Sequence, residues 1–170
     1  MFIALTGTPG TGKSSAANIL AGRGFIVRTV EELARQHGAL ETVDGELEVD
    51  TGKLSEALEE PSEAIIIEGH LAHHLPNGLC IILRCHPEEV RKRLLPRKYS
   101  REKLLENLEA EAIDIILTEA LETCGKVCEV DTSGMPPEKV ADTIESIING
   151  EADKHPPGKI DWSGAVMDWY

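Results

Sequence analysis

Long hydrophobic segments are absent from this chain of 170 residues. No stretch approaches the roughly 18 continuous apolar residues that a membrane-spanning helix requires. The apolar run at residues 2–5 is too short for the core of a signal peptide, and no basic residues precede it. We therefore expect a cytoplasmic protein that has no membrane partner.

Basic residues are also scarce. The chain has 17 Lys and Arg against 30 Asp and Glu, which gives a net charge of −13. Proteins that bind nucleic acids non-specifically need basic surfaces to displace counterions. We therefore expect no direct non-specific binding of nucleic acid, because an acidic surface favours a basic partner instead.

Cysteine is limited to four residues, spaced as Cys-x4-Cys (80 and 85) and Cys-x3-Cys (124 and 128). Structural zinc sites usually contain closer pairs such as Cys-x2-Cys, so this spacing gives little support for a metal site. Cys80 lies in an apolar run and Cys85 at its end, and both are expected to be strand residues. Disulfides are disfavoured in a cytosolic chain.

Short apolar segments alternate with helix-like segments along the chain. The expected strands are 2–6, 25–28, 64–68, 79–84 and 126–130. Continuous β-branched runs of this length are typical of parallel strands that are buried on both faces. The pattern predicts an α/β protein, a three-layer sandwich in which helices cover both faces of a five-stranded parallel sheet.

The remaining segments complete this prediction. Helices are expected over 13–21, 31–37, 54–58, 87–95, 101–122 and 136–148, and the acidic segment 38–52 is expected to form a loop. The length suits one domain over 1–150, followed by a tail over 151–170 that has no helical period. The tail contains both tryptophans. It is expected either to lay Trp162 and Trp169 onto the body or to act as a docking arm for a partner.

The segment Gly-Thr-Pro-Gly-Thr-Gly-Lys-Ser at 7–14 matches the phosphate-binding pattern G-x4-G-K-[ST]. An apolar strand precedes it and a helix follows, as the mechanism requires, because backbone N–H groups and the helix dipole then face the phosphates. The lysine can reach the β- and γ-phosphates, and the serine hydroxyl can bind Mg²⁺. We expect the phosphates of ATP to contact Gly10, Gly12, Lys13, Ser14 and Ser15.

A phosphate-binding loop indicates a nucleotide without specifying the reaction. GTPases carry an N-K-x-D motif, which is absent, and the chain is short for most motor or AAA-type ATPases. Small nucleoside and nucleotide kinases remain, and these close arginines over the transferred phosphoryl group. Basic residues gather at 91–101, where Arg93 and Arg97 are candidate catalytic residues. They would share one face of a helix unless Pro96 ends it, and the alternative is a solvated basic patch.

Several short motifs occur together in this sequence. They are Leu-Thr-Gly-Thr-Pro-Gly-Thr-Gly-Lys-Ser-Ser at 5–15, Glu-Leu-Ala-Arg at 32–35, Glu-Gly-His at 68–70, Leu-Arg-Cys-His-Pro at 83–87, Arg-Lys-Tyr at 97–99 and Glu-Asn at 106–107. In this combination, which covers roughly residues 1–148, the chain resembles the CINAP-type atypical adenylate kinases. That family also acts as ribosome-assembly ATPases, and the resemblance is greatest to its short archaeal members.

The resemblance implies a P-loop nucleoside-monophosphate kinase fold with strand order 2-3-1-4-5. It implies a nucleoside-monophosphate-binding segment near 29–49 and a short lid near 96–106. Within these, Arg97 would contact the nucleotide and Arg35 would face the phosphate of AMP. It also implies Mg²⁺-dependent conversion of ATP and AMP to two ADP, ATPase activity, and a basic small-subunit ribosomal protein as partner in ribosome assembly.

Glu68 and His70 match the Asp-x-His motif of that family at the end of its third strand. The resemblance implies that the carboxylate orders the water shell of Mg²⁺ and that the histidine takes part in ATP hydrolysis. Independently, an acidic residue at the carboxyl end of a buried strand is expected near the metal, because ligands bind at that edge of such sheets. The sequence departs from the family pattern by a Glu for Asp at 68 and by Lys98 for the usual glycine of the lid.

His73 and His74 follow His70 closely and together suggest a metal cluster. No carboxylate lies at a spacing that would complete such a site. The two residues are therefore expected to be surface or interface histidines.

Three functions remain open on these grounds. The first is an adenylate kinase. The second is an assembly factor whose nucleotide state controls its hold on a basic partner, with hydrolysis through His70 as the reset. The third is a kinase for another small metabolite, such as shikimate or gluconate, which ranks last because no further arginine cluster is available for a carboxylate substrate.

Overall fold

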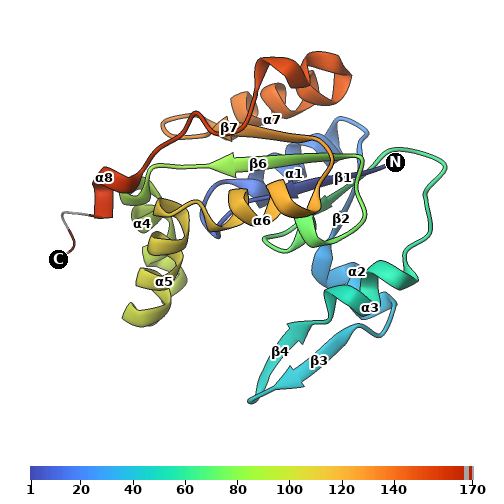
Figure 1. Ribbon diagram of the computed structural model, residues 1–170, viewed down its shortest axis with the longest axis horizontal. Helices are drawn as coiled ribbons and strands as arrows, with labels where there is room; N and C mark the ends of the chain where they lie inside the picture. The colour runs from blue at the N-terminus through green and yellow to red at the C-terminus, as the bar shows by residue number, and fades with distance from the viewer. Residues whose placement is uncertain (167–168, 170) are drawn as a thin grey trace.

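The computed structural model describes residues 1–166 and 169, and its main element is a five-stranded parallel sheet. The strands are β1 (Phe2–Thr6), β2 (Ile26–Thr29), β5 (Ile65–Glu68), β6 (Leu79–Arg84) and β7 (Val127–Asp131), in the spatial order β2-β5-β1-β6-β7 (Figure 1). Counted along the chain within this sheet, the order is 2-3-1-4-5. The predicted fold class and strand order are confirmed.

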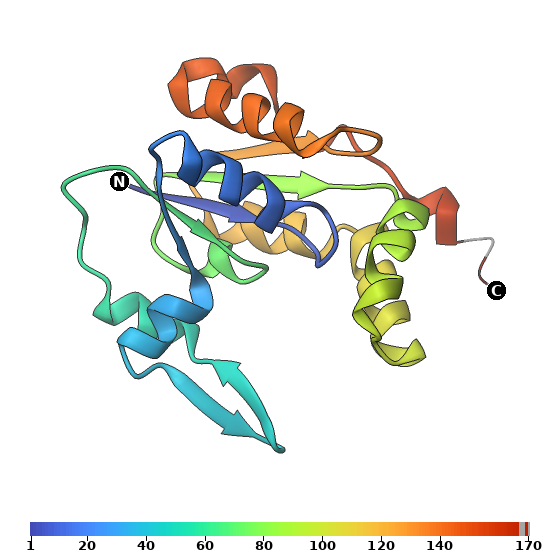
Figure 2. The ribbon, with the colours of Figure 1, turned by 180° about the vertical axis from the view of Figure 1, so that it is seen from behind.

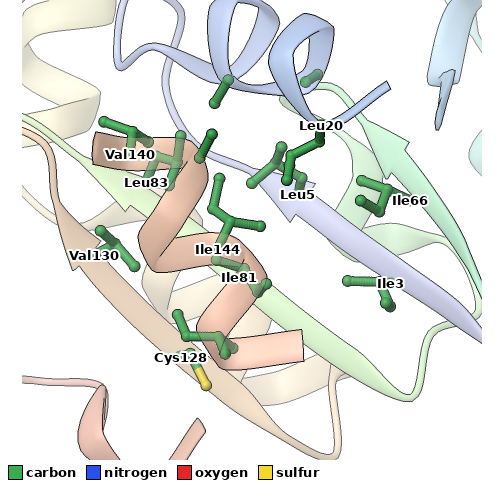
Figure 3. Close-up of a cluster of buried hydrophobic side chains, with 14 of the residues drawn as sticks. Ile3, Leu5, Leu20, Ile66, Ile81, Leu83, Cys128, Val130, Val140 and Ile144 are labelled. Atoms are coloured by element: carbon green, nitrogen blue, oxygen red, sulfur yellow. The ribbon is translucent and has the colours of Figure 1, made fainter. Parts of the chain in front are cut away.

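Helices cover both faces of this sheet and make three layers. Alternate residues of β1 point in opposite directions, so Ile3 and Leu5 enter one hydrophobic cluster while Phe2 and Ala4 enter the other. The first cluster includes residues of α1 (Lys13–Gly22) and α7 (Pro137–Ser146), as Figure 3 shows for Leu20 and Ile144. The second cluster includes residues of α2 (Val30–Gln36), α3 (Thr51–Ala57) and α6 (Ile115–Thr123).

The loop predicted over 38–52 is wrong, because this segment contains a β-hairpin that projects from the body (Figure 2). Strands β3 (Leu40–Val43) and β4 (Glu46–Val49) pair in antiparallel register. They are joined by Asp44 and Gly45, whose φ angles are 50° and 82°. Asp-Gly is a preferred pair for such a two-residue turn, in which both residues have positive φ.

The single helix predicted over 101–122 is also wrong. The segment forms two helices, α5 (Arg101–Ala112) and α6, which are separated by Asp114 in the left-handed conformation with φ 60°. The Asp114 carboxylate accepts a hydrogen bond from Nη2 of the buried Arg84. A tertiary ion pair therefore fixes a break in the helix that the helical pattern of the sequence does not indicate.

Helix α4 (Pro87–Leu94) ends before Pro96, and a 3-10 turn, η2 (Leu95–Arg97), leads to Lys98 with φ 54°. A small separate cluster, which includes Val90, Leu94 and Leu108, packs α4 against α5. This helix pair and the hairpin project to the same side of the sheet (Figures 1 and 2), and both follow the carboxyl ends of its parallel strands.

The C-terminal segment returns along β7 toward α4. It contains the turns η3 (Ile147–Glu151) and η4 (Ala152–Lys154) and a short helix, α8 (Ser163–Val166), which the sequence did not indicate. Trp162 packs edge-on against His86 with 5.1 Å between ring centroids, and Trp169 Nε1 donates to Glu88 Oε1 at 3.4 Å. In the described residues, Trp162 thus contacts the residue before α4. Trp169 contacts α4 itself, where Arg91 lies 5.9 Å from its ring centroid, and packs against the cluster of Val90, Leu94 and Leu108.

Two further expectations can be compared with the described residues. The four cysteines are free thiols, and Cys80 and Cys85 are buried in and directly after β6. None of the described helices combines the length and the apolar character that crossing a membrane would demand.

Candidate active site

The phosphate loop runs from the carboxyl end of β1 into α1 at the centre of the sheet. Gly7 cannot be replaced without rearrangement, because a Cβ atom there would lie 2.5 Å from the carbonyl oxygen of Leu83. Gly12 caps α1 with φ 103° and supplies no side chain to the first turn. The N–H groups at the start of a helix have no intrahelical partners, so those of this turn face the loop as an anion site.

Neighbouring elements hold this loop from outside. Thr8 Oγ1 donates to Glu111 Oε2 in α5 at 2.7 Å, and Thr132 Oγ1, just after β7, donates to the Thr11 carbonyl at 2.8 Å. Arg93 Nη1 in α4 donates to the Gly10 carbonyl at 3.2 Å. Because these contacts use hydroxyl and carbonyl groups of the loop, they fix its shape without occupying its amide N–H groups.

Lys13 lies inside the loop. Its Nζ donates to the carbonyl oxygens of Gly7 at 2.6 Å and Thr8 at 2.9 Å. An ammonium group has three donors, so one remains for another acceptor. Burial lowers the pKa of Lys13 to about 8, an effect that the carboxylate of Glu68 opposes and the charge of Arg97 reinforces.

Ser14 and Glu68 face each other beside the lysine. The Ser14 hydroxyl lies 3.4 Å from Glu68 Oε1, and the strand pairing places Glu68 opposite Leu5 at the carboxyl end of β5. Burial raises the pKa of Glu68, whereas Lys13 and the Ser14 hydroxyl lower it. A hydroxyl and a carboxylate oxygen at this distance fit Mg²⁺, which prefers oxygen ligands, takes few of them from the protein and keeps several waters.

A cavity of about 870 Å³ opens next to these two residues. Its lining is Ser14, Thr29, Val30, Glu31, Leu40, Leu47, Glu48, Val49, Thr51, Glu68, Gly69, His70, Leu71 and His74. The hairpin supplies the apolar side chains Leu40, Leu47 and Val49. These residues were not predicted, because their segment was expected to be a loop, although the Asp-Gly pair at 44–45 was a usable signal for a hairpin.

His70 is exposed in this cavity, two residues beyond Glu68. Partial withdrawal of the ring from water lowers the pKa of His70, and the charge of Lys13 lowers it further. The ring is therefore neutral near pH 7 and able to accept a proton. The 3-10 turn η1 (Ala72–His74) begins after Leu71 and has no side-chain cap, so His70 does not cap it.

The predicted arginines occupy different places. Arg97 is exposed in η2, and its charge acts on the pKa of Lys13. Arg93 pairs with Glu89 and with the Gly10 carbonyl, so it contacts the outer side of the loop. Arg35 pairs with Glu31 at 3.0 Å and lines a separate depression beside the main cavity.

A buried ion cluster lies behind the loop and was not anticipated. Arg84, at the end of β6, donates to Glu111 Oε1 at 2.8 Å, to Glu129 Oε2 at 2.7 Å and to Asp114. Burial alone would lower the pKa of Arg84, but these carboxylates together raise it, so the guanidinium stays charged. The signal in the sequence was a lone arginine at the end of an apolar strand, which must find partners when buried.

The expectation of surface or interface histidines is wrong for His73, whose side chain is fully buried. Its Nδ1 lies 2.9 Å from Thr6 Oγ1 and its Nε2 lies 2.7 Å from Glu119 Oε2. His74 is half-buried and also approaches Glu119, at 3.3 Å. The carboxylate absent from the local sequence is thus supplied by α6.

The comparisons with known sequences agree with this geometry. The chain is 48% identical to a protein of Archaeoglobus fulgidus named “Putative adenylate kinase”, over 99% of this chain and 95% of the relative. A protein of Methanothermobacter thermautotrophicus with the same name is 45% identical, over 98% of this chain and 99% of the relative. A family described as “AAA domain” matches residues 3–114. The short length of the chain was therefore not a valid reason to set AAA-type proteins aside.

Solved structures share the fold at low sequence identity. A shikimate kinase from Acinetobacter baumannii aligns with a TM-score of 0.63 and 17% identity, covering 88% of this chain and 93% of that one. A thymidylate kinase from Candida albicans aligns with a TM-score of 0.58 and 15% identity, covering 88% and 91%. These likenesses support the P-loop nucleoside-monophosphate kinase fold.

Proposed function

This chain belongs to the family of archaeal P-loop proteins that carry the name “Putative adenylate kinase”, and we propose that it transfers the γ-phosphoryl group of ATP to AMP. The observation that carries the proposal is the convergence of Lys13, Ser14 and Glu68 at the phosphate loop, directly beside a cavity of about 870 Å³. A phosphate site and a second, adjoining pocket are what a kinase for a small acceptor requires.

The donor nucleotide binds through its phosphates. The amide groups of Gly10, Gly12 and the first turn of α1, including Ser15, surround the phosphate oxygens, while the free donor of Lys13 reaches the β- and γ-phosphates. Because Glu111, Thr132 and Arg93 hold the loop from outside, it needs little rearrangement to bind phosphate. Positioning of this kind supplies most of the catalysis in phosphoryl transfer.

Mg²⁺ would be held by the Ser14 hydroxyl and, through water, by Glu68. An ion held there would supply positive charge that neutralises the negative charge developing on the phosphate oxygens during transfer. The longer side chain of a glutamate, where the resembling family has an aspartate, brings the carboxylate to 3.4 Å from the serine hydroxyl.

The acceptor occupies the cavity between the sheet edge and the hairpin, within the proposed nucleoside-monophosphate-binding segment 29–49. Leu40, Leu47 and Val49 offer an apolar wall for the base. Arg35 binds the acceptor phosphate, which requires that it exchange its exposed ion pair with Glu31 for the ligand. Exposed pairs of this kind contribute only about 0–1 kcal/mol, so the exchange costs little.

The proposed lid, 96–106, places Arg97 over the transferred group, where a cation stabilises the charge of the transition state. Arg93 acts from the other side as a positioning residue, because it contacts the loop carbonyl of Gly10. His70 stands at the cavity with a lowered pKa. In the absence of AMP, its neutral ring can accept a proton from a water that attacks the γ-phosphate, which gives the accompanying ATPase activity.

The deciding experiment measures ADP formation from ATP and Mg²⁺ with AMP, without AMP, and with shikimate or gluconate in its place. Strong stimulation by AMP alone is expected, and Lys13→Ala is expected to abolish turnover because a charge-assisted phosphate contact is lost. His70→Ala should reduce AMP-independent hydrolysis more than transfer to AMP, with the exposed His37→Ala as control. Stimulation by a metabolite instead of AMP would overturn the proposed acceptor.

A second function is favoured by the net charge of −13. An acidic surface complements a basic protein, and the resemblance to the CINAP-type family points to a small-subunit ribosomal protein. In that case, nucleotide state controls the complex and hydrolysis through His70 releases it during ribosome assembly. Slow AMP-independent turnover that changes when a basic ribosomal protein is added would support this function, and an unchanged rate would count against it.

A further inference from the structure

Three potential metal ligands converge outside the proposed Mg²⁺ site. Nε2 of His73 and Nε2 of His74 lie 2.7 Å and 3.3 Å from the same atom, Oε2 of Glu119. The ligand atoms of the three residues all lie within 4.8 Å of one another. We propose that His73, His74 and Glu119 form a binding site for a divalent transition-metal ion of the zinc class.

The ligand types select this class of ion. Two imidazole nitrogens and one carboxylate oxygen are the donor set of three-ligand zinc sites, in which water takes the fourth position. Mg²⁺ prefers oxygen ligands and near-octahedral geometry, so it is poorly suited to a site with two nitrogens. The ion of this site therefore differs from the ion proposed for Ser14 and Glu68.

The two distances to Glu119 need only a small adjustment. In a tetrahedral site with ligands about 2.0–2.2 Å from zinc, neighbouring ligand atoms lie about 3.3–3.6 Å apart. The separation between His74 and Glu119 already has this value, at 3.3 Å. The carboxylate must move away from His73 by less than about 1 Å, which its 42% exposed side chain allows.

The surrounding residues orient the buried ligand. Thr6 Oγ1 lies 2.9 Å from Nδ1 of His73, on the opposite side of the ring from the proposed ion. When Nδ1 donates to this hydroxyl, Nε2 keeps its lone pair for a metal, and such a contact on the second nitrogen is usual for metal-binding histidines. The His73 carbonyl also accepts from Thr123 Oγ1 at 3.1 Å, which holds η1 against α6.

The cluster combines a rigid base with an open side. The His73 side chain is fully buried, whereas those of His74 and Glu119 are 31% and 42% exposed. The open side admits an ion and leaves room for a water ligand. His74 also lines the main cavity beside His70, so a bound ion would fix one part of the cavity wall without using a residue of the phosphate site.

The test is a titration of the chelator-treated, tag-free chain with Zn²⁺ by calorimetry and with Co²⁺ by visible spectroscopy, both in excess Mg²⁺. We expect one equivalent of ion, a ligand-field band of tetrahedral Co²⁺, and a higher Tm, because an ion that binds the folded state stabilises it. Glu119→Gln and His74→Ala should weaken binding at least tenfold. Both replace partly exposed side chains, so the variants are expected to fold.

Matched controls make the result specific. Glu122→Gln changes an exposed residue of the same helix, His37→Ala removes an exposed histidine elsewhere, and Cys124→Ser removes the nearby half-buried thiol. All three variants should bind Zn²⁺ and Co²⁺ with the affinity of the original chain. The proposal is overturned if Co²⁺ gives no ligand-field band, or if Glu119→Gln and His74→Ala both retain full affinity. In either case the cluster is a hydrogen-bond network only.

Discussion

The hydroxyl of Thr8 donates to Oε2 of Glu111 across 2.7 Å, and this contact joins the phosphate loop to α5, 103 residues further along the chain. The other oxygen of Glu111 accepts from Arg84 at 2.8 Å and from the amide of Cys85 at 3.1 Å. One buried carboxylate thus connects the loop, the end of β6 and the helix α5, which begins within the proposed lid. The shape of the phosphate site depends on a residue that no phosphate-binding motif contains.

Thr8→Val removes this hydroxyl while keeping the volume of the side chain. Loss of a hydrogen bond to a buried carboxylate is expected to lower the free energy of unfolding by about 1–3 kcal/mol. The KM for ATP should also rise severalfold, because the loop loses one of its outer contacts. Urea unfolding and initial-rate kinetics measure the two effects. Thr118→Val, at an exposed position of α6, is the control and should change neither.

The main sheet was predictable because each of its strands is a short, continuous apolar run, which can be recognised in the local sequence without knowledge of tertiary contacts. The hairpin was missed for a different reason. Its strands mix acidic residues with isolated apolar ones at Leu40, Val43, Leu47 and Val49, and the turn residues Asp44 and Gly45 were the one distinctive signal. The break between α5 and α6 had no local signal, since the contact that stabilises it comes from Arg84, 30 residues earlier.

The candidate site was predictable to the extent that it follows a contiguous motif. Lys13, Ser14 and the acid at the end of β5 meet as expected, because a strand, a glycine-rich loop and a helix place them together. Glu111 and Glu119 could not be found, because their partners lie on distant elements. The pairing of Arg93 with the outside of the loop was likewise invisible without the position of α4.

Asp114 offers a test of the break between the helices. Asp114→Ala places alanine in the left-handed region, which costs about 1–2 kcal/mol, and removes a charged hydrogen bond to Arg84, which is worth about 1.5–3 kcal/mol. The free energy of unfolding should fall by about 2.5–5 kcal/mol, as the sum of these two. Asp44→Ala is the matched control, because Asp44 is exposed and also has positive φ. It should show only the smaller conformational cost, and equal losses would refute the role of Arg84.

The hairpin should affect the binding of the acceptor AMP and not the binding of the donor ATP. Leu47 is 65% exposed and lines the cavity. Leu47→Asp is expected to raise the KM for AMP about tenfold or more, since burying a leucine against a ligand contributes about 1.5–3 kcal/mol. Hydrolysis of ATP without AMP should not change. Val43→Asp, on the opposite face of the hairpin, should leave both reactions intact, and an equal effect of the two variants would show that the hairpin does not present a specific face to AMP.

The lowered pKa of Lys13 predicts how nucleotide binding depends on pH. In the free protein the ammonium loses its proton at a pKa of about 8, below its ordinary value of 10.5. Bound phosphates favour the charged form and raise this pKa. Below pH 8 the lysine is charged in both states, so the Kd for ATP should be constant there. Above pH 8 binding must take up a proton, and the Kd should rise by up to about tenfold per pH unit.

Calorimetric titration with ATP at constant Mg²⁺ from pH 7 to about pH 9.5 measures this slope, and the enthalpy in buffers of different ionisation heat reports the proton uptake directly. Lys13→Arg is the control, because a guanidinium stays charged throughout this range. It should bind more weakly at every pH but without the slope. The same slope in Lys13→Arg would assign the titration to another group, and a flat profile in the original chain would show that Lys13 keeps its proton in the free protein.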